Sequence, residues 1–132
     1  MTSSSESSKN QLHQAAIAAR NQSHSPYSKY KVGSALRLTS GEIFSGCNIE
    51  NASYGLTICA ERIALGNAIS AGNKNITAVA VYSPIDSISP CGACRQFIIE
   101  FGSDVIVLFK QDKKNIQKKI NELLPFQFKM PG

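Results

Sequence analysis

Three of the four cysteines lie in two short motifs that can bind a metal ion. Cys59 begins the sequence Cys-Ala-Glu-Arg, and Cys91 and Cys94 lie further along in Pro-Cys-Gly-Ala-Cys. Residues three apart on a helix share a face, so both thiols of the second motif can contact one ion. A helix that starts at each motif would also favour the thiolate form, because the helix dipole is positive at that end.

Zinc is the metal that this set of donors favours. Three thiolates fill three positions of a tetrahedral site and leave the fourth for water, as in catalytic zinc centres. Glu61, two residues beyond Cys59, is placed to take a proton from that water and pass it to a substrate. Arg62 is the adjacent cation that can offset the negative charge of the thiolates.

Other interpretations of the same residues stay open at this point. The Cys-x-x-Cys pair could be a redox dithiol, although a loop with Pro90 precedes it rather than a strand. A fourth thiol, Cys47, could close the site into a purely structural one, but it falls in or next to a predicted strand and is more typical of a small buried side chain. Arg62 could instead form an ion pair at the surface.

Hydrophobic periodicity predicts alternating helices and strands that would position these motifs. The predicted helices lie at residues 9–22, 59–71 (with Thr57 as its cap), about 91–101 and 116–124, and the predicted strands at 32–38, 43–47, 77–82 and 105–109. Two buried apolar strands separated by helices indicate a mixed sheet that is covered on both faces.

The length of 132 residues is that of one domain, which we place at residues 9–132 after a flexible Ser-rich segment at 1–8. The chain has neither a signal-like start nor an apolar run long enough for a membrane helix, so we expect no membrane association. The net charge is +5, with a lysine excess from Lys110 to Lys129 that we assign to the solvated face of the last helix.

The two cysteine motifs and three further blocks resemble those of the small, homotetrameric, zinc-dependent cytidine deaminases. The matching blocks are Ser25–Gly33, Gly46–Tyr54, Cys59–Arg62, Ser89–Gln96 and Glu122–Pro125. The superfamily signature is His-x-Glu followed by Pro-Cys-x-x-Cys, and Cys59 occupies its His position. The resemblance covers nearly the whole chain after the Ser-rich start. It implies an α/β fold with three layers, α-β-α, around a mixed five-stranded sheet.

The resemblance also implies a role for each matched residue. Cys59, Cys91 and Cys94 would bind one zinc ion per subunit. Glu61 would move a proton from the zinc-bound water to N3 of cytosine and then to the leaving ammonia, and Arg62 would temper the charge of the sulfurs. The implied substrate contacts are Asn48 and Glu50 at the ribose 3′-hydroxyl, the backbone N–H of Ala60 at the pyrimidine carbonyl, Tyr30 at the base, Ala52 and Tyr54 at the ribose end from a neighbouring subunit, and Phe128 at the base of an adjacent subunit's substrate.

Two positions depart from the family's pattern. Tyr30 stands where the family usually has Phe, and its hydroxyl must find a partner or water. Near the end of the chain, Phe126 is a second candidate for the stacking role that the resemblance assigns to Phe128.

The implied function is hydrolytic deamination of cytidine and deoxycytidine to uridine and deoxyuridine, with release of ammonia, in cytoplasmic pyrimidine salvage. A homotetramer would explain how so short a chain encloses a substrate, because neighbours would complete the pocket. One alternative is deamination of a non-nucleoside cytosine compound such as blasticidin S, whose deaminases lack the Asn-x-Glu pair present here as Asn48 and Glu50. Two others are a non-catalytic zinc module and a nucleic-acid editor. We expect no nucleic-acid partner, because no aromatic residue interrupts the run from Lys113 to Lys119.

Overall fold

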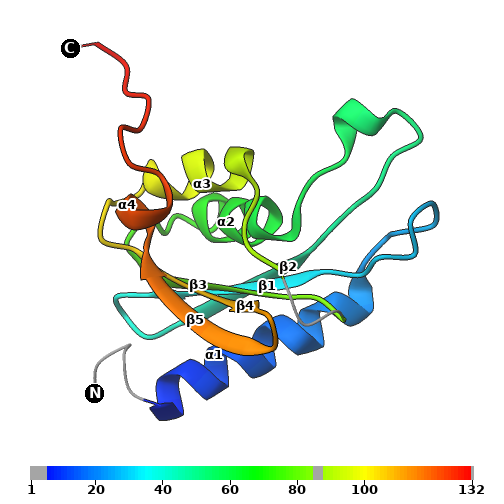
Figure 1. Ribbon diagram of the computed structural model, residues 1–132, viewed down its shortest axis with the longest axis horizontal. Helices are drawn as coiled ribbons and strands as arrows, with labels where there is room; N and C mark the ends of the chain where they lie inside the picture. The colour runs from blue at the N-terminus through cyan, green and yellow to red at the C-terminus, as the bar shows by residue number, and fades with distance from the viewer. Residues whose placement is uncertain (1–5, 85–87, 132) are drawn as a thin grey trace.

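A five-stranded sheet lies between one helix on one face and three helices on the other (Figure 1). The computed structural model describes residues 6–84 and 88–131. The elements are α1 (Glu6–Ala19), a short 3-10 turn (Arg20–Gln22), β1 (Gly33–Leu38), β2 (Ile43–Cys47), a second 3-10 turn (Tyr54–Leu56), α2 (Ala60–Ser70), β3 (Ile76–Tyr82), α3 (Gly92–Ile99), β4 (Ile106–Gln111), β5 (Lys114–Lys119) and α4 (Ile120–Leu123).

The strand order is β2-β1-β3-β4-β5, and the predicted mixed sheet is confirmed. Strands β3 and β4 are parallel, whereas the other neighbouring strands are antiparallel. The parallel pair is joined through α3, as a crossover connection between parallel strands requires. Among the described residues, no helix has the length and apolar character needed to cross a membrane.

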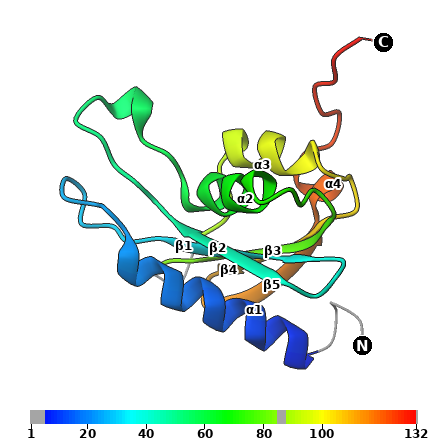
Figure 2. The ribbon, with the colours of Figure 1, turned by 180° about the vertical axis from the view of Figure 1, so that it is seen from behind.

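Alternate residues of the central strands face the two helical layers, as the pleat of a strand dictates. Ala78 and Ala80 of β3 pack with Leu12 and Ala16 of α1, whereas Val79 belongs to the core beneath α2 and α3. The small side chains let α1 lie close to the sheet, and Figure 2 shows α1 alone on its face.

Helix α2 lies against β2 at a distance that only glycine permits. A Cβ atom on Gly46 would be 2.4 Å from the backbone nitrogen of Ala64. Because Ala60, Ala64 and Ala68 are fully buried on the helix face that meets the core, the axis of α2 is held close to the sheet. This contact determines where the first turn of α2 lies.

The predicted helix at 116–124 is wrong over most of its length. Residues Lys114–Lys119 form the edge strand β5, and only Ile120–Leu123 are helical. Asp112 and Lys113 both have positive φ angles, 51° and 68°, and make a two-residue turn that brings β5 back along β4. Ile116 therefore lies opposite Phe109 in a strand pair, although its four-residue spacing from Ile120 imitates a helix.

The lysine-rich stretch is thus a strand edge rather than a helix face. Lys114, Lys118 and Lys119 are exposed on β5, and charged side chains at a sheet edge discourage pairing with the edge of another chain.

Two helix boundaries differ from expectation. Helix α1 begins at Glu6 rather than at Lys9, and Ser8 is already buried within it. Residues 1–5, the rest of the segment expected to be flexible, lie outside the described residues. The cap of α2 is Cys59 and not Thr57, whose hydroxyl accepts a hydrogen bond from the backbone N–H of Asn51 at 3.2 Å.

Candidate active site

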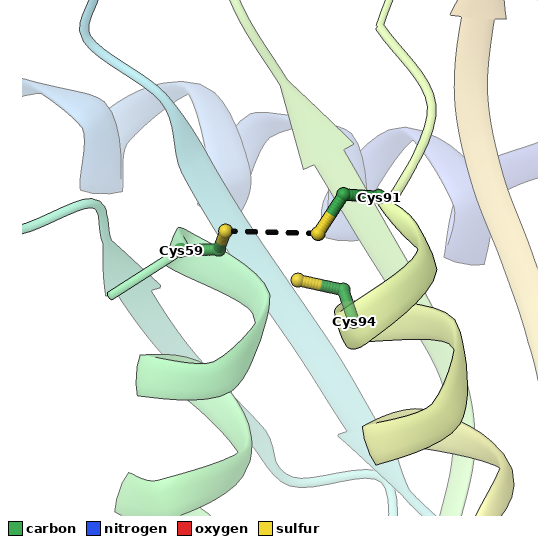
Figure 3. A group of neighbouring side chains, drawn as sticks. All are labelled: Cys59, Cys91 and Cys94. Atoms are coloured by element: carbon green, nitrogen blue, oxygen red, sulfur yellow. Dashed lines mark hydrogen bonds between the residues drawn. The ribbon is translucent and has the colours of Figure 1, made fainter. Parts of the chain in front are cut away.

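The thiols of Cys59, Cys91 and Cys94 meet between the beginnings of α2 and α3. All three sulfur atoms lie within 4.8 Å of one another, and the Sγ atoms of Cys59 and Cys91 are 3.9 Å apart. Figure 3 shows Cys59 at the start of α2 facing both cysteines of α3. Cys59 and Cys91 are the N-cap residues of the two helices, and Cys94 lies in the first turn of α3. The convergence predicted from the two motifs is confirmed.

This arrangement fits a zinc ion. Three sulfurs at ~2.3 Å from one tetrahedral zinc would be roughly 3.8 Å apart, which agrees with the distance between Cys59 and Cys91. Within the described residues, Cys47 is not part of the cluster, so it does not close the site as a fourth ligand. The protein therefore offers three ligands and leaves one position open, as catalytic zinc sites do.

The pKa values of Cys59 and Cys94 are shifted in opposite directions. Hydrogen bonds from Cys94, Arg62 and Cys91 lower the pKa of Cys59 to about 5. The pKa of Cys94 is raised, first by its hydrogen bond to Cys59 and then by burial. A divalent cation would displace the retained protons, because only thiolates bind it.

Glu61 is buried beside these thiols, with 4% of its surface exposed. It lies in the first turn of α2, two residues from Cys59. Burial, assisted by the negative charge of Cys59, raises the pKa of Glu61 to about 7. A carboxyl group with a pKa near neutrality can both accept and donate a proton, which is the requirement for general acid–base chemistry.

Arg62 contacts the cluster directly. Its Nη2 donates to the sulfur of Cys59 at 3.7 Å and to the carbonyl of Thr57 at 3.5 Å. The hydrogen bond to Cys59 raises the pKa of the guanidinium group. The alternative of an ion pair at the surface is not what the structure shows for this side chain.

A cavity of about 390 Å³ contains two of the predicted substrate residues, Glu50 and Tyr54, together with Tyr27, Ser28 and Thr57. Backbone hydrogen bonds in both directions join Ile49 to Ile58, at 3.0 and 2.9 Å. This bridge closes the loop of residues 50–57 directly before Cys59. Thr57, which lines the cavity, accepts through its carbonyl a hydrogen bond from Arg62, which also donates to the sulfur of Cys59.

The side chain of Asn48 is almost fully engaged within the protein. Its Oδ1 accepts from the backbone N–H of Val32 at 2.9 Å and from the hydroxyl of Ser23, and its Nδ2 donates to the carbonyl of Tyr30 at 2.8 Å. An amide has two donor hydrogens and two acceptor lone pairs. Among the described residues, only the carbonyl of Tyr30 accepts from Nδ2 of Asn48, which leaves its second N–H for a ligand.

Glu50 is held by the turn at residues 25–28, a contact that the sequence did not predict. Its carboxylate accepts from the backbone N–H groups of Tyr27 at 3.0 Å and Ser28 at 3.1 Å, and from the hydroxyl of Ser28. These contacts, led by the hydroxyl of Ser28, lower the pKa of Glu50. The Ser-Pro-Tyr-Ser turn at 25–28 was the available signal, because serine and proline favour such turns.

The remaining predicted site residues are spread more widely. Ala60 is the first residue of α2, where backbone N–H groups have no partner inside the helix. Tyr30 packs at the edge of the core. Tyr54 is 81% exposed and Phe128 67% exposed, and Ala52 is exposed on the same loop as Tyr54. The segment after α4 and the loop of residues 50–57 lie towards opposite sides of the molecule in Figures 1 and 2, and Phe128 is not among the residues that line the cavity.

Comparisons with known proteins agree with this geometry. Residues 6–110 match the family model described as the cytidine and deoxycytidylate deaminase zinc-binding region. A probable cytidine deaminase from Dictyostelium discoideum is 45% identical over 116 residues, which cover 86% of this chain and 79% of the relative. A blasticidin-S deaminase from Bacillus cereus is 39% identical over 109 residues, which cover 76% of this chain and 78% of the relative.

A crystal structure of cytidine deaminase from Burkholderia pseudomallei has the same fold. It superposes with a TM-score of 0.85 at 44% identity and covers 90% of this chain and 98% of its own. The family match spans both cysteine motifs and most of the chain. The description of the family names zinc, the metal that the three thiols fit. On these grounds the protein belongs to the zinc-dependent cytidine and deoxycytidylate deaminase family.

Proposed function

We propose that the protein hydrolyses cytidine and deoxycytidine to uridine and deoxyuridine and releases ammonia. The observation that carries this proposal is the buried carboxyl group of Glu61 beside three convergent thiols. Relatives that cover most of the chain and are described as cytidine deaminases support the choice of substrate.

Cys59, Cys91 and Cys94 would hold the zinc ion. Bound there, zinc supplies a Lewis acid that makes a water molecule acidic enough to react near neutral pH. Glu61 takes a proton from the attacking water and donates it to N3 of the cytosine ring. It later transfers a proton to the amino group, which leaves as ammonia. Its position on α2 leaves the sulfurs to bind the metal and the carboxyl group free to move protons.

Arg62 acts on the sulfurs rather than on the substrate in this proposal. Its contact with Cys59 offsets part of the negative charge of the thiolates, which would otherwise oppose acidification of water. The backbone N–H of Ala60, at the N-terminal end of α2, would bind the pyrimidine carbonyl, and Tyr30 would contact the base.

Asn48 and Glu50 form a matched pair for one sugar hydroxyl. Asn48 has a single N–H left to donate, and the carboxylate of Glu50 can only accept. A hydroxyl group accepts from the first and donates to the second at the same time. This pairing supports a nucleoside with a free 3′-hydroxyl group as the substrate.

Deamination of a blasticidin-like compound is the second candidate. The observation that favours it is the 39% identity to the Bacillus cereus enzyme. Asn48 and Glu50 argue for the nucleoside, because a cytosine compound without ribose would leave the cavity beside Glu50 without its hydroxyl partner.

We also propose that four copies of the chain assemble, each completing a neighbour's pocket with Ala52, Tyr54 and Phe128. The exposure of Tyr54, Leu56, Phe126 and Phe128 supports this assembly, because apolar side chains so exposed are typical of binding surfaces.

We place the enzyme in the cytoplasm, in pyrimidine salvage, where thiol ligands stay reduced. Its substrate is a free nucleoside rather than a nucleic acid.

Zinc analysis and cytidine turnover on the same purified sample test the proposal. We expect one zinc per chain, with uridine and ammonia formed in equal amounts and blasticidin S turned over much more slowly. Folded protein that contains zinc but forms no uridine would contradict it. Faster turnover of blasticidin S than of cytidine would favour the second candidate.

A further inference from the structure

Two neighbouring side chains of α3 bind three main-chain carbonyl groups, one in the loop just before the helix and two near the end of the chain. Arg95 donates from Nε to the carbonyl of Pro90 at 2.9 Å and from Nη1 to the carbonyl of Leu123 at 2.9 Å. Gln96 donates from Nε2 to the carbonyl of Phe128 at 3.1 Å. Arg95 follows the ligand Cys94 directly, so these contacts begin beside the thiol cluster.

The contact with Pro90 acts on a metal ligand. The carbonyl of Pro90 and the nitrogen and Cα atoms of Cys91 belong to one planar peptide unit. When Arg95 fixes the direction of that carbonyl, it also fixes the peptide plane from which the side chain of Cys91 projects. Nη2 of Arg95 also donates to the hydroxyl of Ser89 at 3.5 Å, so the same guanidinium group contacts the residue before Pro90 as well.

The contact with Leu123 acts on the end of the chain. Leu123 is the last residue of α4, where carbonyl groups have no partner inside the helix and a cation is favourable. The chain then passes Phe126, whose φ angle is 57°, and reaches Phe128, whose carbonyl is held by Gln96. The exposed aromatic segment 126–128 is thus attached to α3 through Leu123, three residues before it, and through its own last residue, Phe128.

We propose that Arg95 is a positioning residue that joins the loop of the ligand Cys91 to the C-terminal aromatic segment. One planar guanidinium group, with donors pointing in different directions, can fix the positions of both segments at once. The part that concerns Phe128 rests on the proposed function, in which that segment serves a neighbouring pocket. The part that concerns Cys91 does not.

The test compares Arg95→Gln with the wild-type protein in two measurements that need no substrate. The first is the rate of zinc release to a coloured chelator, which we expect to rise about 10- to 100-fold, because residues that orient metal ligands typically have effects of this size. The second is the absorption spectrum of the cobalt-substituted protein, in which the thiolate-to-cobalt band should shift. Arg95→Lys has a single side-chain nitrogen that cannot reach the carbonyls of both Pro90 and Leu123. It should release zinc at a rate between those of the wild-type protein and Arg95→Gln.

Two control variants separate this role from general damage. Gln96→Ala frees only the aromatic segment, so it should raise KM for cytidine while zinc release stays at the wild-type rate. Arg37→Gln removes another arginine that binds main-chain carbonyls, those of Ser8 and Gly41, far along the chain from the thiols. It should leave both zinc release and the cobalt spectrum unchanged. Arg95→Gln should change zinc release and KM together.

Zinc release at the wild-type rate in folded Arg95→Gln would overturn the proposal, as would equal acceleration in Arg37→Gln. If Arg95→Gln does not fold, Arg95→Lys decides by the same two measurements. If no variant or wild-type sample turns over cytidine, the proposed function fails while the zinc and cobalt results still decide the role of Arg95 at Cys91.

Discussion

At the scale of single residues, the centre brings together acidic groups whose charges disfavour one another. A buried carboxyl group and three clustered thiols cannot all ionise without a compensating cation. Arg62 supplies part of that charge through its contact with Cys59, and zinc would supply the rest. The position of Glu61 on the first turn of a helix, beside the ligands but not among them, is what allows it a separate task.

Replacement of Glu61 by glutamine should separate metal binding from catalysis. Because the sulfurs remain in place, we expect zinc content to equal that of the wild-type protein. We expect kcat for cytidine to fall by ~10²- to 10⁴-fold, the usual contribution of a positioned acid–base group. Zinc analysis and steady-state kinetics measure the two quantities. Glu42→Gln, at an exposed turn, is the control, and activity of Glu61→Gln within about tenfold of wild type would contradict the role.

Replacement of Ser28 by alanine should change the titration of Glu50. The hydroxyl of Ser28 is the main reason that the pKa of Glu50 lies below its ordinary value, so its removal should move that pKa upward. As the solution is acidified, Glu50 would then lose its negative charge, which we propose binds ribose, at a higher pH. Carbon NMR of the labelled carboxyl group measures the shift directly, and KM for cytidine should rise first on the acid side. An unchanged titration curve would mean that the backbone N–H groups alone hold the carboxylate.

At the scale of elements, the site depends on how closely α2 approaches the sheet. Gly46 of β2 makes that approach possible, and the first turn of the same helix carries Cys59 and Glu61. A substitution at Gly46 that displaces the middle of α2 should therefore also displace Cys59 and Glu61 at its first turn.

Two glycine-to-alanine substitutions test this relation with the same chemical change. Gly46→Ala places a methyl group 2.4 Å from the backbone of α2, so we expect the free energy of unfolding to fall by about 1–3 kcal/mol. Gly66→Ala, within α2, meets nothing within 4 Å and should raise that energy by about 0.4–1 kcal/mol. Urea denaturation at one protein concentration measures both. Equal stability of the two variants would show that α2 can move away from β2 freely.

At the scale of the whole molecule, this chain has a cavity at one side and an exposed aromatic segment at the other. The residues that line the cavity do not include those of the aromatic segment. An assembly in which each copy lends its aromatic segment to the next would use both.

Mixed assemblies of two inactive variants test whether Phe128 acts in a neighbour. Glu61→Gln lacks the acid–base group and Phe128→Ala lacks the aromatic ring, so each alone should be poorly active at low cytidine concentration. After unfolding and refolding together, roughly a quarter of the sites would combine an intact Glu61 with a neighbour's intact Phe128, given random association. Activity should recover to roughly a quarter of the wild-type value at the same total chain concentration. Absence of recovery would place Phe128 in its own chain's site, and Phe126→Ala, which should remain active, is the control.

The sequence by itself determined the chemistry of the centre. Cysteines and a glutamate at the starts of two helices indicate a metal and a proton carrier, because capping positions and the spacing of three residues are local properties of a helix. The alternation of apolar segments likewise determined four of the five strands. The family resemblance, carried by residue blocks along nearly the whole chain, implied the same fold.

Only the tertiary structure decided the features that depend on distant partners. The edge strand at Lys114–Lys119 exists because β4 pairs with it, and its local sequence matched a helix equally well. The hydrogen bonds from Asn48 to Tyr30, from Ser28 to Glu50 and from Arg95 to Leu123 all join residues that are far apart along the chain. Such contacts leave no periodic pattern in the sequence, since hydrogen bonds between distant segments form only after the layers have packed.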